Sequence, residues 1–174
     1  MTYITPPVGV APTAYYYPYF VLATGPDLLS ELQQSRQNTL QYFEQLDPGR
    51  AHYRYEAGKW SVQQILRHIN DAERILCYRA LRFARHDYTM LPGFNQDHYA
   101  EHDHHDKATL AQVIAEYLSV RSATLSFYET IAENALDNTA SANGLDFSPR
   151  LLGWMISGHN RHHLKVLRER YSAA

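Results

Sequence analysis

Cysteine, surplus charge of either sign and long apolar runs are all scarce in this chain of 174 residues. The single cysteine, Cys77, excludes an internal disulfide framework and is typical of a reducing compartment, so we expect a cytoplasmic location. Sixteen Lys and Arg residues nearly balance 18 Asp and Glu residues, which predicts no surface for nucleic acid or for an anionic membrane. No segment approaches the roughly 20 apolar residues that cross a bilayer, so we expect no membrane partner.

The N-terminal segment also lacks the features of a secretory signal. It has no basic stretch, and its prolines interrupt any apolar helix. We therefore expect residues 1–25 to form an extended arm and residues 26–174 to form a single helical bundle domain. The arm carries several aromatic side chains, which could latch it onto its own domain or mediate a homodimer: Tyr15, Tyr16, Tyr17, Tyr19 and Phe20.

The rest of the chain shows apolar residues at helical spacing in four segments. No segment alternates with period two and β-branched residues never cluster, so the sequence predicts an all-α fold. Two of the starts carry capping signals. At the second helix, Ser61 and Gln64 form a capping box. At the fourth helix, Ser148 is followed by a proline at the first helical position. The predicted helices begin at Asp27, at Ser61, near Asp106 or Thr109, and at Ser148.

One connection is much longer than antiparallel neighbours require. Residues 86–105, between the second and third helices, are about twenty in number, whereas helices in a bundle are commonly joined by short loops. We refer to residues 86–105 as the crossover. It predicts a four-helix bundle in which the second and third helices run parallel, with residues 94–99 passing the beginning of the second helix.

Four of the ten histidines lie on apolar helix faces. His68 falls in the centre of the apolar stripe of the second helix, and the fourth helix contains His159, His162 and His163. Residues at i and i+4 lie on one face of a helix, so two imidazoles there can bind one ion and a third can come from a facing helix. The alternative is a set of unrelated core histidines. Spacing alone leaves open whether His162 or His163 is the ligand.

The remaining histidines carry a weaker signal. Four lie in the polar sequence QDHYAEHDHHDK of the crossover, where a solvated loop is the favoured interpretation and a surface metal patch is the alternative. His52 and His86 lie at polar or terminal positions and indicate no site. The crossover histidines are His98, His102, His104 and His105.

Three segments together carry a family resemblance: KWSVQQILRHINDAERILCYRALRFAR, LPGFNQD and FSPRLLGWMISGHNRHHLKVLRERY. From about Tyr16 to Tyr171 the chain resembles the DinB/YfiT-like metalloprotein superfamily, specifically its DinB_2 branch. The resemblance implies a bundle of up-down-down-up order that binds a divalent metal, commonly nickel or zinc. Carried onto this sequence, it implies the ligands His68, His159 and His163, with His162 beside them as a bystander.

The resemblance also implies chemistry. Several relatives are thiol S-transferases that act with low-molecular-weight thiols, one group is a thiol-dependent isomerase, and the superfamily is also labelled as metal-dependent hydrolases. Relatives often form homodimers. Three hypotheses follow for this chain: a metal-dependent enzyme that transfers a thiol onto a small-molecule electrophile, a hydrolase that uses metal-activated water, and a non-catalytic bundle that binds a metal or small ligand.

Few side chains near the predicted ligands suggest further roles. Asp71 lies one turn after His68 and could orient a ligand imidazole, although a surface charge explains it equally well. Asp97 is a second candidate because the crossover is expected to pass the metal. Glu73 lies off the face of His68, and we interpret it as the partner of an arginine.

The inner stripes supply three candidates for a substrate pocket: Arg79, Tyr117 and Tyr128. Core packing is the default for an inward tyrosine, whereas an inward arginine is unusual because it requires a carboxylate partner. Cys77 is out of register with His68 and is interpreted as a core residue.

Overall fold

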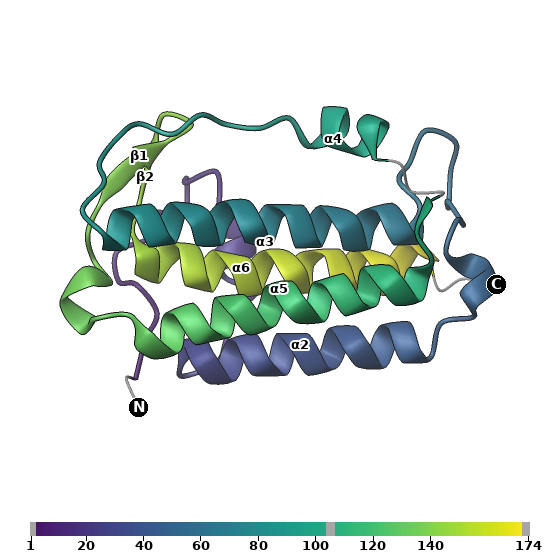
Figure 1. The fold of residues 1–174 in the computed structure, drawn as a ribbon, viewed down its shortest axis with the longest axis horizontal. Coiled ribbons are helices and arrows are strands. Elements are labelled where there is room, and N and C mark those ends of the chain that lie inside the picture. The colour runs from purple at the N-terminus through teal and green to yellow at the C-terminus, as the bar shows by residue number, and fades with distance from the viewer. Residues whose placement is uncertain (1–2, 104–106, 172–174) are drawn as a thin grey trace.

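In the computed structural model, which describes residues 3–103 and 107–171, four long helices pack side by side (Figure 1). The four predicted starts are confirmed, because the side chains of Asp27, Ser61, Thr109 and Ser148 each accept a hydrogen bond from a backbone N–H three residues later. The helices are α2 (Leu28–Glu44), α3 (Val62–Ala84), α5 (Leu110–Thr130) and α6 (Pro149–Val166).

The chain follows the predicted up-down-down-up order. Figure 1 shows the crossover returning along the outside of α3, so that α3 and α5 run in the same direction. The crossover carries a short helix, α4 (Gln96–His102), and the side-chain amide of Gln64 donates to the carbonyl of Ala100 at 3.1 Å. The predicted passage past the beginning of the second helix is therefore confirmed. His104 and His105 lie outside the described residues.

A small β-hairpin departs from the predicted all-α composition. Strands β1 (Ala140–Ala142) and β2 (Leu145–Phe147) pair antiparallel, and Asn143 and Gly144 between them both have positive φ angles. Strands of three residues are too short to show an alternation of period two, which explains the error. The Asn-Gly pair was the available signal, because tight hairpin turns favour these two residues.

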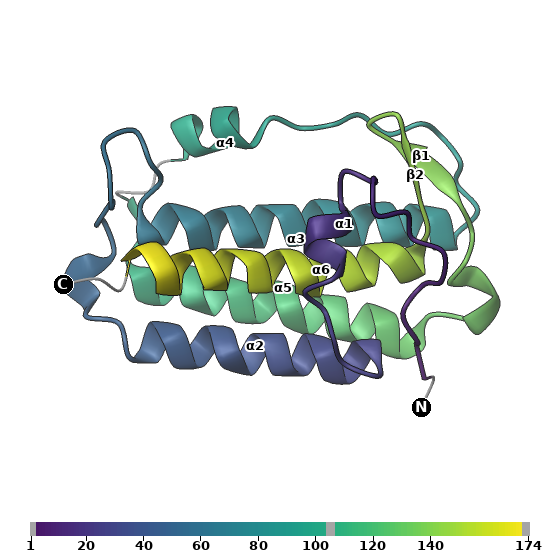
Figure 2. The ribbon, with the colours of Figure 1, turned by 180° about the vertical axis from the view of Figure 1, so that it is seen from behind.

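The N-terminal arm packs against its own chain. Ile4 is fully buried, and its backbone N–H donates to the carboxylate of Asp27 at 2.8 Å. A short helix, α1 (Tyr17–Phe20), lies across α6 (Figure 2), where a side chain at Gly158 would clash with the carbonyl of Tyr19. Association of two chains stays a prediction.

The core consists of two apolar clusters with a polar layer between them. One cluster, near the hairpin, includes Phe83 and Trp154, and the other, at the opposite end of the bundle, includes Leu66 and Leu167. The sequence positions between these clusters on the four helices carry buried polar side chains. None of the described helices is long and apolar enough to cross a membrane. The polar layer contains the predicted metal ligands.

Candidate metal centre

Three histidines from two helices converge in the polar layer. His68 comes from α3, and His159 and His163 come from successive turns of α6. The Nε2 atom of His159 lies 3.0 Å from that of His68 and 3.1 Å from that of His163. One nitrogen from each ring lies within 4.8 Å of the other two. The structure thus brings together the three residues that the resemblance implied.

Two of the three nitrogen separations match those around a single divalent ion. Two imidazole nitrogens that bind one zinc ion at about 2.0–2.1 Å lie roughly 2.8–3.4 Å apart, depending on the bond angle. The two distances to His159 Nε2 fall within that range. Imidazole donors suit ions of intermediate hardness such as zinc and nickel.

Burial keeps the three imidazoles in the form that binds a metal. Removal from water, together with the nearby His162, lowers the pKa of His68 to about 4. Burial likewise holds the pKa values of His159 and His163 well below the usual range, and the neighbouring imidazoles add to the effect. At neutral pH all three rings are therefore uncharged, as metal ligation requires.

Aromatic rings pack against the cluster, and His162 lies at its edge, with its ring 5.0 Å from that of His163 between centroids. The ring of Trp60 lies 4.8 Å from that of His68, between centroids, and the ring of Tyr19 lies 5.4 Å from that of His159. His162 instead stacks edge-on against Tyr19 at 5.1 Å and is half-buried. Of the two residues between which spacing could not choose, His163 joins the cluster and His162 does not.

A cavity of about 430 Å³ adjoins the histidines. His68 and His159 lie in its wall, and Tyr15 and Tyr19 of the arm, the beginning of α4 and the hairpin complete it. Of the described residues in its wall, Arg79 is the only Lys or Arg and none is Asp or Glu. The wall is otherwise apolar or amide-bearing: Ala72, Leu76, Gly93, Phe94, Asn95, Gln96, Asn143, Leu145, Phe147 and Met155.

A buried ion pair fixes α6 beside the cluster. Arg121 of α5 is fully buried and binds Glu73 of α3 through two bonds of 2.8 Å, which confirms the interpretation of Glu73 as the partner of an arginine. The guanidinium also donates to Asn160 at 3.1 Å, and Tyr117 donates to the same amide oxygen at 2.8 Å. Sequence reasoning missed Arg121, although it lies four residues after Tyr117 on the same stripe.

A second missed residue, Glu31 of α2, clamps the neighbouring turn of α6. Its carboxylate is buried and accepts hydrogen bonds from Ser157 at 2.8 Å and from Arg161 at 2.5 Å. The other carboxylate oxygen accepts from the backbone N–H of Gly25 at 2.9 Å. Nothing in the local sequence distinguishes Glu31 from a surface charge, because its two side-chain partners lie more than 120 residues away.

The two predicted carboxylates do not line the cavity. Asp71 faces Arg74, with 3.7 Å between its carboxylate and the guanidinium, and burial raises its pKa. Asp97 is exposed in the first turn of α4, and the neighbouring Asn95 and Gln96 reach the cavity instead. The crossover passes the cavity as expected, but the helical turn points Asp97 outward.

Of the three predicted pocket residues, only Arg79 lies in the cavity wall. Tyr117 and Tyr128 are fully buried packing residues, and the hydroxyl of Tyr128 donates to the carbonyl of Pro149 at 2.8 Å. Among the described residues no carboxylate pairs with Arg79, and one of its nitrogens donates to the carbonyl of Pro92 at 2.8 Å. Cys77 is partly buried against the core, and burial raises its pKa to about 11.

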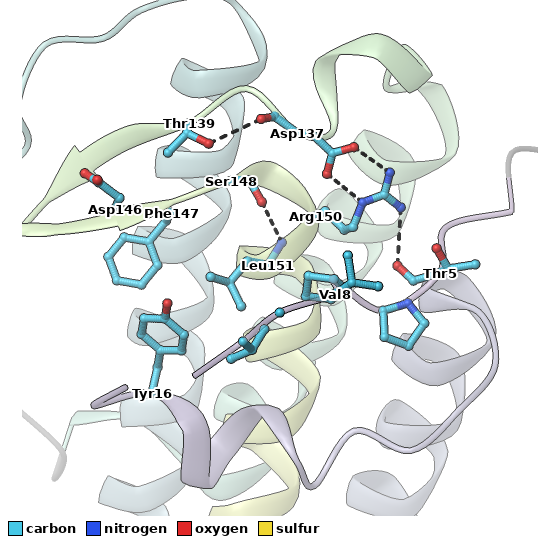
Figure 3. Close-up of a pocket in the computed structure, with 14 residues that line it drawn as sticks. Thr5, Val8, Tyr16, Asp137, Thr139, Asp146, Phe147, Ser148, Arg150 and Leu151 are labelled. Carbon is cyan, nitrogen blue, oxygen red and sulfur yellow. Dashed lines mark hydrogen bonds and ion pairs between the residues drawn. The ribbon is translucent and has the colours of Figure 1, made fainter. Parts of the chain in front are cut away.

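Two other places on the molecule lack the features of the cluster. His98 and His102 of α4 are exposed, with ring centroids 4.1 Å apart, and belong to no group of three ligands among the described residues. A cavity of about 490 Å³ between the arm and the hairpin (Figure 3) has its arginine, Arg150, bound to Asp137. The histidine cluster is therefore the candidate site.

Comparisons with known proteins agree with this fold. Residues 31–167 match the family model of the DinB superfamily. The structure of YfiT from Bacillus subtilis, described as an unusual four-helix bundle topology, superposes with a TM-score of 0.72 at 13% identity, over 84% of this chain and 87% of that chain. A search of curated proteins gave no match. Because the family model spans most of the sequence, the chain belongs to the DinB superfamily.

Proposed function

We propose that this protein is a metal-dependent enzyme that transfers a low-molecular-weight thiol onto an electrophilic small molecule. The observation that carries the proposal is a cluster of three neutral histidines that opens into a cavity whose described wall residues include no carboxylate. The thiol chemistry itself follows the resemblance of the sequence to DinB-type S-transferases.

A divalent ion such as nickel or zinc, when bound, would lower the pKa of a thiol and so supply a nucleophile at neutral pH. The chain contributes three uncharged donors, which leave the full positive charge of the ion in place. Trp60 and Tyr19 pack against the imidazoles and limit the access of water.

The proposed reaction balances without a further reagent. The thiol loses its proton to solvent, its sulfur forms a bond to the electrophilic carbon, and the bond from that carbon to the leaving group breaks with the electron pair. The apolar wall of the cavity, which includes Leu76, Phe94 and Met155, would hold the carbon skeleton of the electrophile. No protein base is needed, because a thiol of lowered pKa ionises on its own.

The second candidate is a hydrolase that uses metal-activated water. It is favoured by the likeness to YfiT, which is described as a probable metal-dependent hydrolase. Hydrolysis normally uses a carboxylate or imidazole to move protons between water and the leaving group. The described residues of the cavity wall offer no carboxylate for that role, and the two imidazoles there, His68 and His159, are the proposed metal ligands, so we place this candidate second.

Elemental analysis of untagged protein tests the metal site. We expect about one nickel or zinc ion per chain, as three-histidine sites hold a single ion. The ion should be lost in His68→Ala, His159→Ala and His163→Ala and kept in the matched control His162→Ala, whose ring lies outside the cluster. Protein that contains no metal and cannot be reloaded would overturn the proposal.

The visible spectrum of cobalt-loaded protein then separates the two reactions. Addition of a simple thiol should change the spectrum, and consumption of an electrophile such as chlorodinitrobenzene should require both the thiol and the metal. Hydrolysis of nitrophenyl acetate without thiol, with no spectral response to thiol, would favour the hydrolase instead.

A further inference from the structure

Arg79 is a buried cation that has no carboxylate partner among the residues that the structure describes. Its side chain is only 7% exposed, and it forms no ion pair with any residue that the structure describes. The one hydrogen bond that it donates, at 2.8 Å, goes to the carbonyl of Pro92 in the crossover. The guanidinium lies in the wall of the cavity that contains His68 and His159.

Arg121, the other buried arginine among the described residues, is paired with a carboxylate, and so are two half-buried arginines. Arg121 binds Glu73, Arg161 binds Glu31, and Arg150 binds Asp137 through two bonds of 2.7 and 2.8 Å (Figure 3). A buried guanidinium is costly unless an anion accompanies it. Burial accordingly lowers the pKa of Arg79, whereas the carboxylate beside Arg150 raises the pKa of that group.

Arg79 and His68 lie far apart along the cavity wall. Both belong to α3 and are eleven residues apart, which corresponds to roughly 16 Å along a helix axis. Between them the same face of α3 presents Ala72 and Leu76, and Met155 of α6 lies in the same wall. The cavity thus has the histidine cluster towards one end, an apolar middle and a single cation towards the other.

We propose that this cavity binds an elongated small molecule whose carboxylate contacts Arg79 while its thiol or electrophilic end reaches the histidine cluster. The inference rests on the proposed function and adds the class of substrate. A carboxylate fits better than a phosphate, because one guanidinium can form two parallel hydrogen bonds to it and no second Lys or Arg lies among the described wall residues. The side-chain amides of Asn95 and Asn143 are available to complete its hydrogen bonding.

Calorimetry with matched thiols tests this assignment. We would titrate metal-loaded protein with mercaptocarboxylates from mercaptopropanoate to mercaptoundecanoate, and with mercaptoalcohols of the same lengths. At the optimal length the acid should bind roughly 10- to 100-fold more tightly than the alcohol, as expected for hydrogen bonds to a charged group. In Arg79→Met this preference should vanish while the dissociation constant of the alcohol is unchanged.

Three controls make the outcome specific. Arg79→Lys, which keeps the charge but loses the paired donors, should retain part of the preference. Arg74→Met removes an arginine of the same helix that lies outside the cavity and binds Glu116, and it should keep the full preference. Unchanged metal content and thermal unfolding of Arg79→Met would exclude a general effect on the fold.

The assignment fails if acid and alcohol bind equally, or if Arg79→Met keeps the preference because the carboxylate binds the ion instead. Octanoate and octanol, which lack a thiol, separate this failure from that of the proposed function. If no thiol binds but octanoate depends on Arg79, the thiol reaction is wrong and the carboxylate site stands. If the thiols bind without discrimination, the carboxylate site is wrong and thiol binding stands.

Discussion

Helix α6 carries buried polar side chains on two faces that differ in how their hydrogen-bonding needs are met. On one face, Asn160 bonds to Arg121, to Tyr117 and to Thr39, all within the bundle. On the other, the Nε2 atoms of His159 and His163 contact each other, and that of His159 also contacts His68. The first face is closed by partners from two other helices, α2 and α5, and the second faces a cavity.

The difference separates structural polar groups from functional ones. A buried network in which every member has a partner of opposite charge or complementary dipole stabilises one arrangement of helices. Each of the three neutral imidazoles has a nitrogen lone pair directed into the cluster, and no carboxylate is there to balance a proton. Such a group contributes little to stability but is suited to binding a cation. The paired network holds α6 in place and the histidines use that position.

The largest loss of stability is expected when the ion pair behind Asn160 is broken. Arg121→Met would leave the carboxylate of Glu73 buried without its partner, so the free energy of unfolding should fall by about 3–5 kcal/mol. Denaturant unfolding of metal-free protein measures this change. Metal affinity should also fall, because the position of Asn160 next to His159 depends on the guanidinium.

The double variant Arg121→Met, Glu73→Leu serves as the control. It removes both charges from the interior and should recover most of the lost stability, as replacement of a buried ion pair by apolar residues often does. Equal destabilisation of the single and double variants would show that packing volume, rather than the unpaired charge, governs this layer.

The sequence predicted the bundle well because its signals are local. Capping residues such as Ser61 and Thr109 and the apolar spacing act within a few residues, and the length of the crossover indicated the order of the helices. The Asn143-Gly144 turn was also a local signal and was overlooked.

The candidate site was partly predictable for the same reason. Two histidines at i and i+4 are visible on one helix, but spacing could not separate His162 from His163, and the choice came from the resemblance. The ion pairs of Arg121 and Glu31 join residues 48 to 130 positions apart, so no local pattern reveals them. The sequence indicated that an inward Arg79 needs a carboxylate partner, and the structure provides none among its described residues.

On the face of α6 that carries His159 and His163, metal binding should raise the free energy of unfolding, whereas loss of one histidine from metal-free protein should change it little. His163→Gln should change the stability of metal-free protein by less than about 1 kcal/mol, because a neutral hydrogen-bonded group is exchanged for another. Excess nickel or zinc at 100 times its dissociation constant should stabilise the wild type by about 2.7 kcal/mol and leave this variant unchanged. Unfolding curves with and without metal measure both quantities, and His162→Gln, which should respond like the wild type, is the matched control.

A smaller effect is expected where the arm crosses α6. A methyl group at Gly158 would clash with the carbonyl of Tyr19, so Gly158→Ala should displace α1 and lower the free energy of unfolding by about 1–3 kcal/mol. Limited proteolysis should then cleave the arm faster. Gly153→Ala, on the same helix, clashes with Leu28 and Tyr128 instead, so it should lower stability without exposing the arm. Equal cleavage of both variants would contradict a specific role of Gly158 in seating Tyr19 over the imidazoles.

The smallest effect should come from Cys77, which is the one thiol of the chain itself. Burial raises its pKa to about 11, so at pH 8 only about one molecule in a thousand carries the thiolate. Alkylation by iodoacetamide should therefore be slow at that pH and accelerate about tenfold for each pH unit up to the pKa. Cys77→Ala should leave thiol transfer intact, since the residue lies outside the cavity wall and the nucleophile comes from the added thiol. Fast alkylation at neutral pH, together with loss of transfer in Cys77→Ala, would show that the nucleophile is Cys77 and not an added thiol. The histidine cluster would then not be needed to activate a thiol.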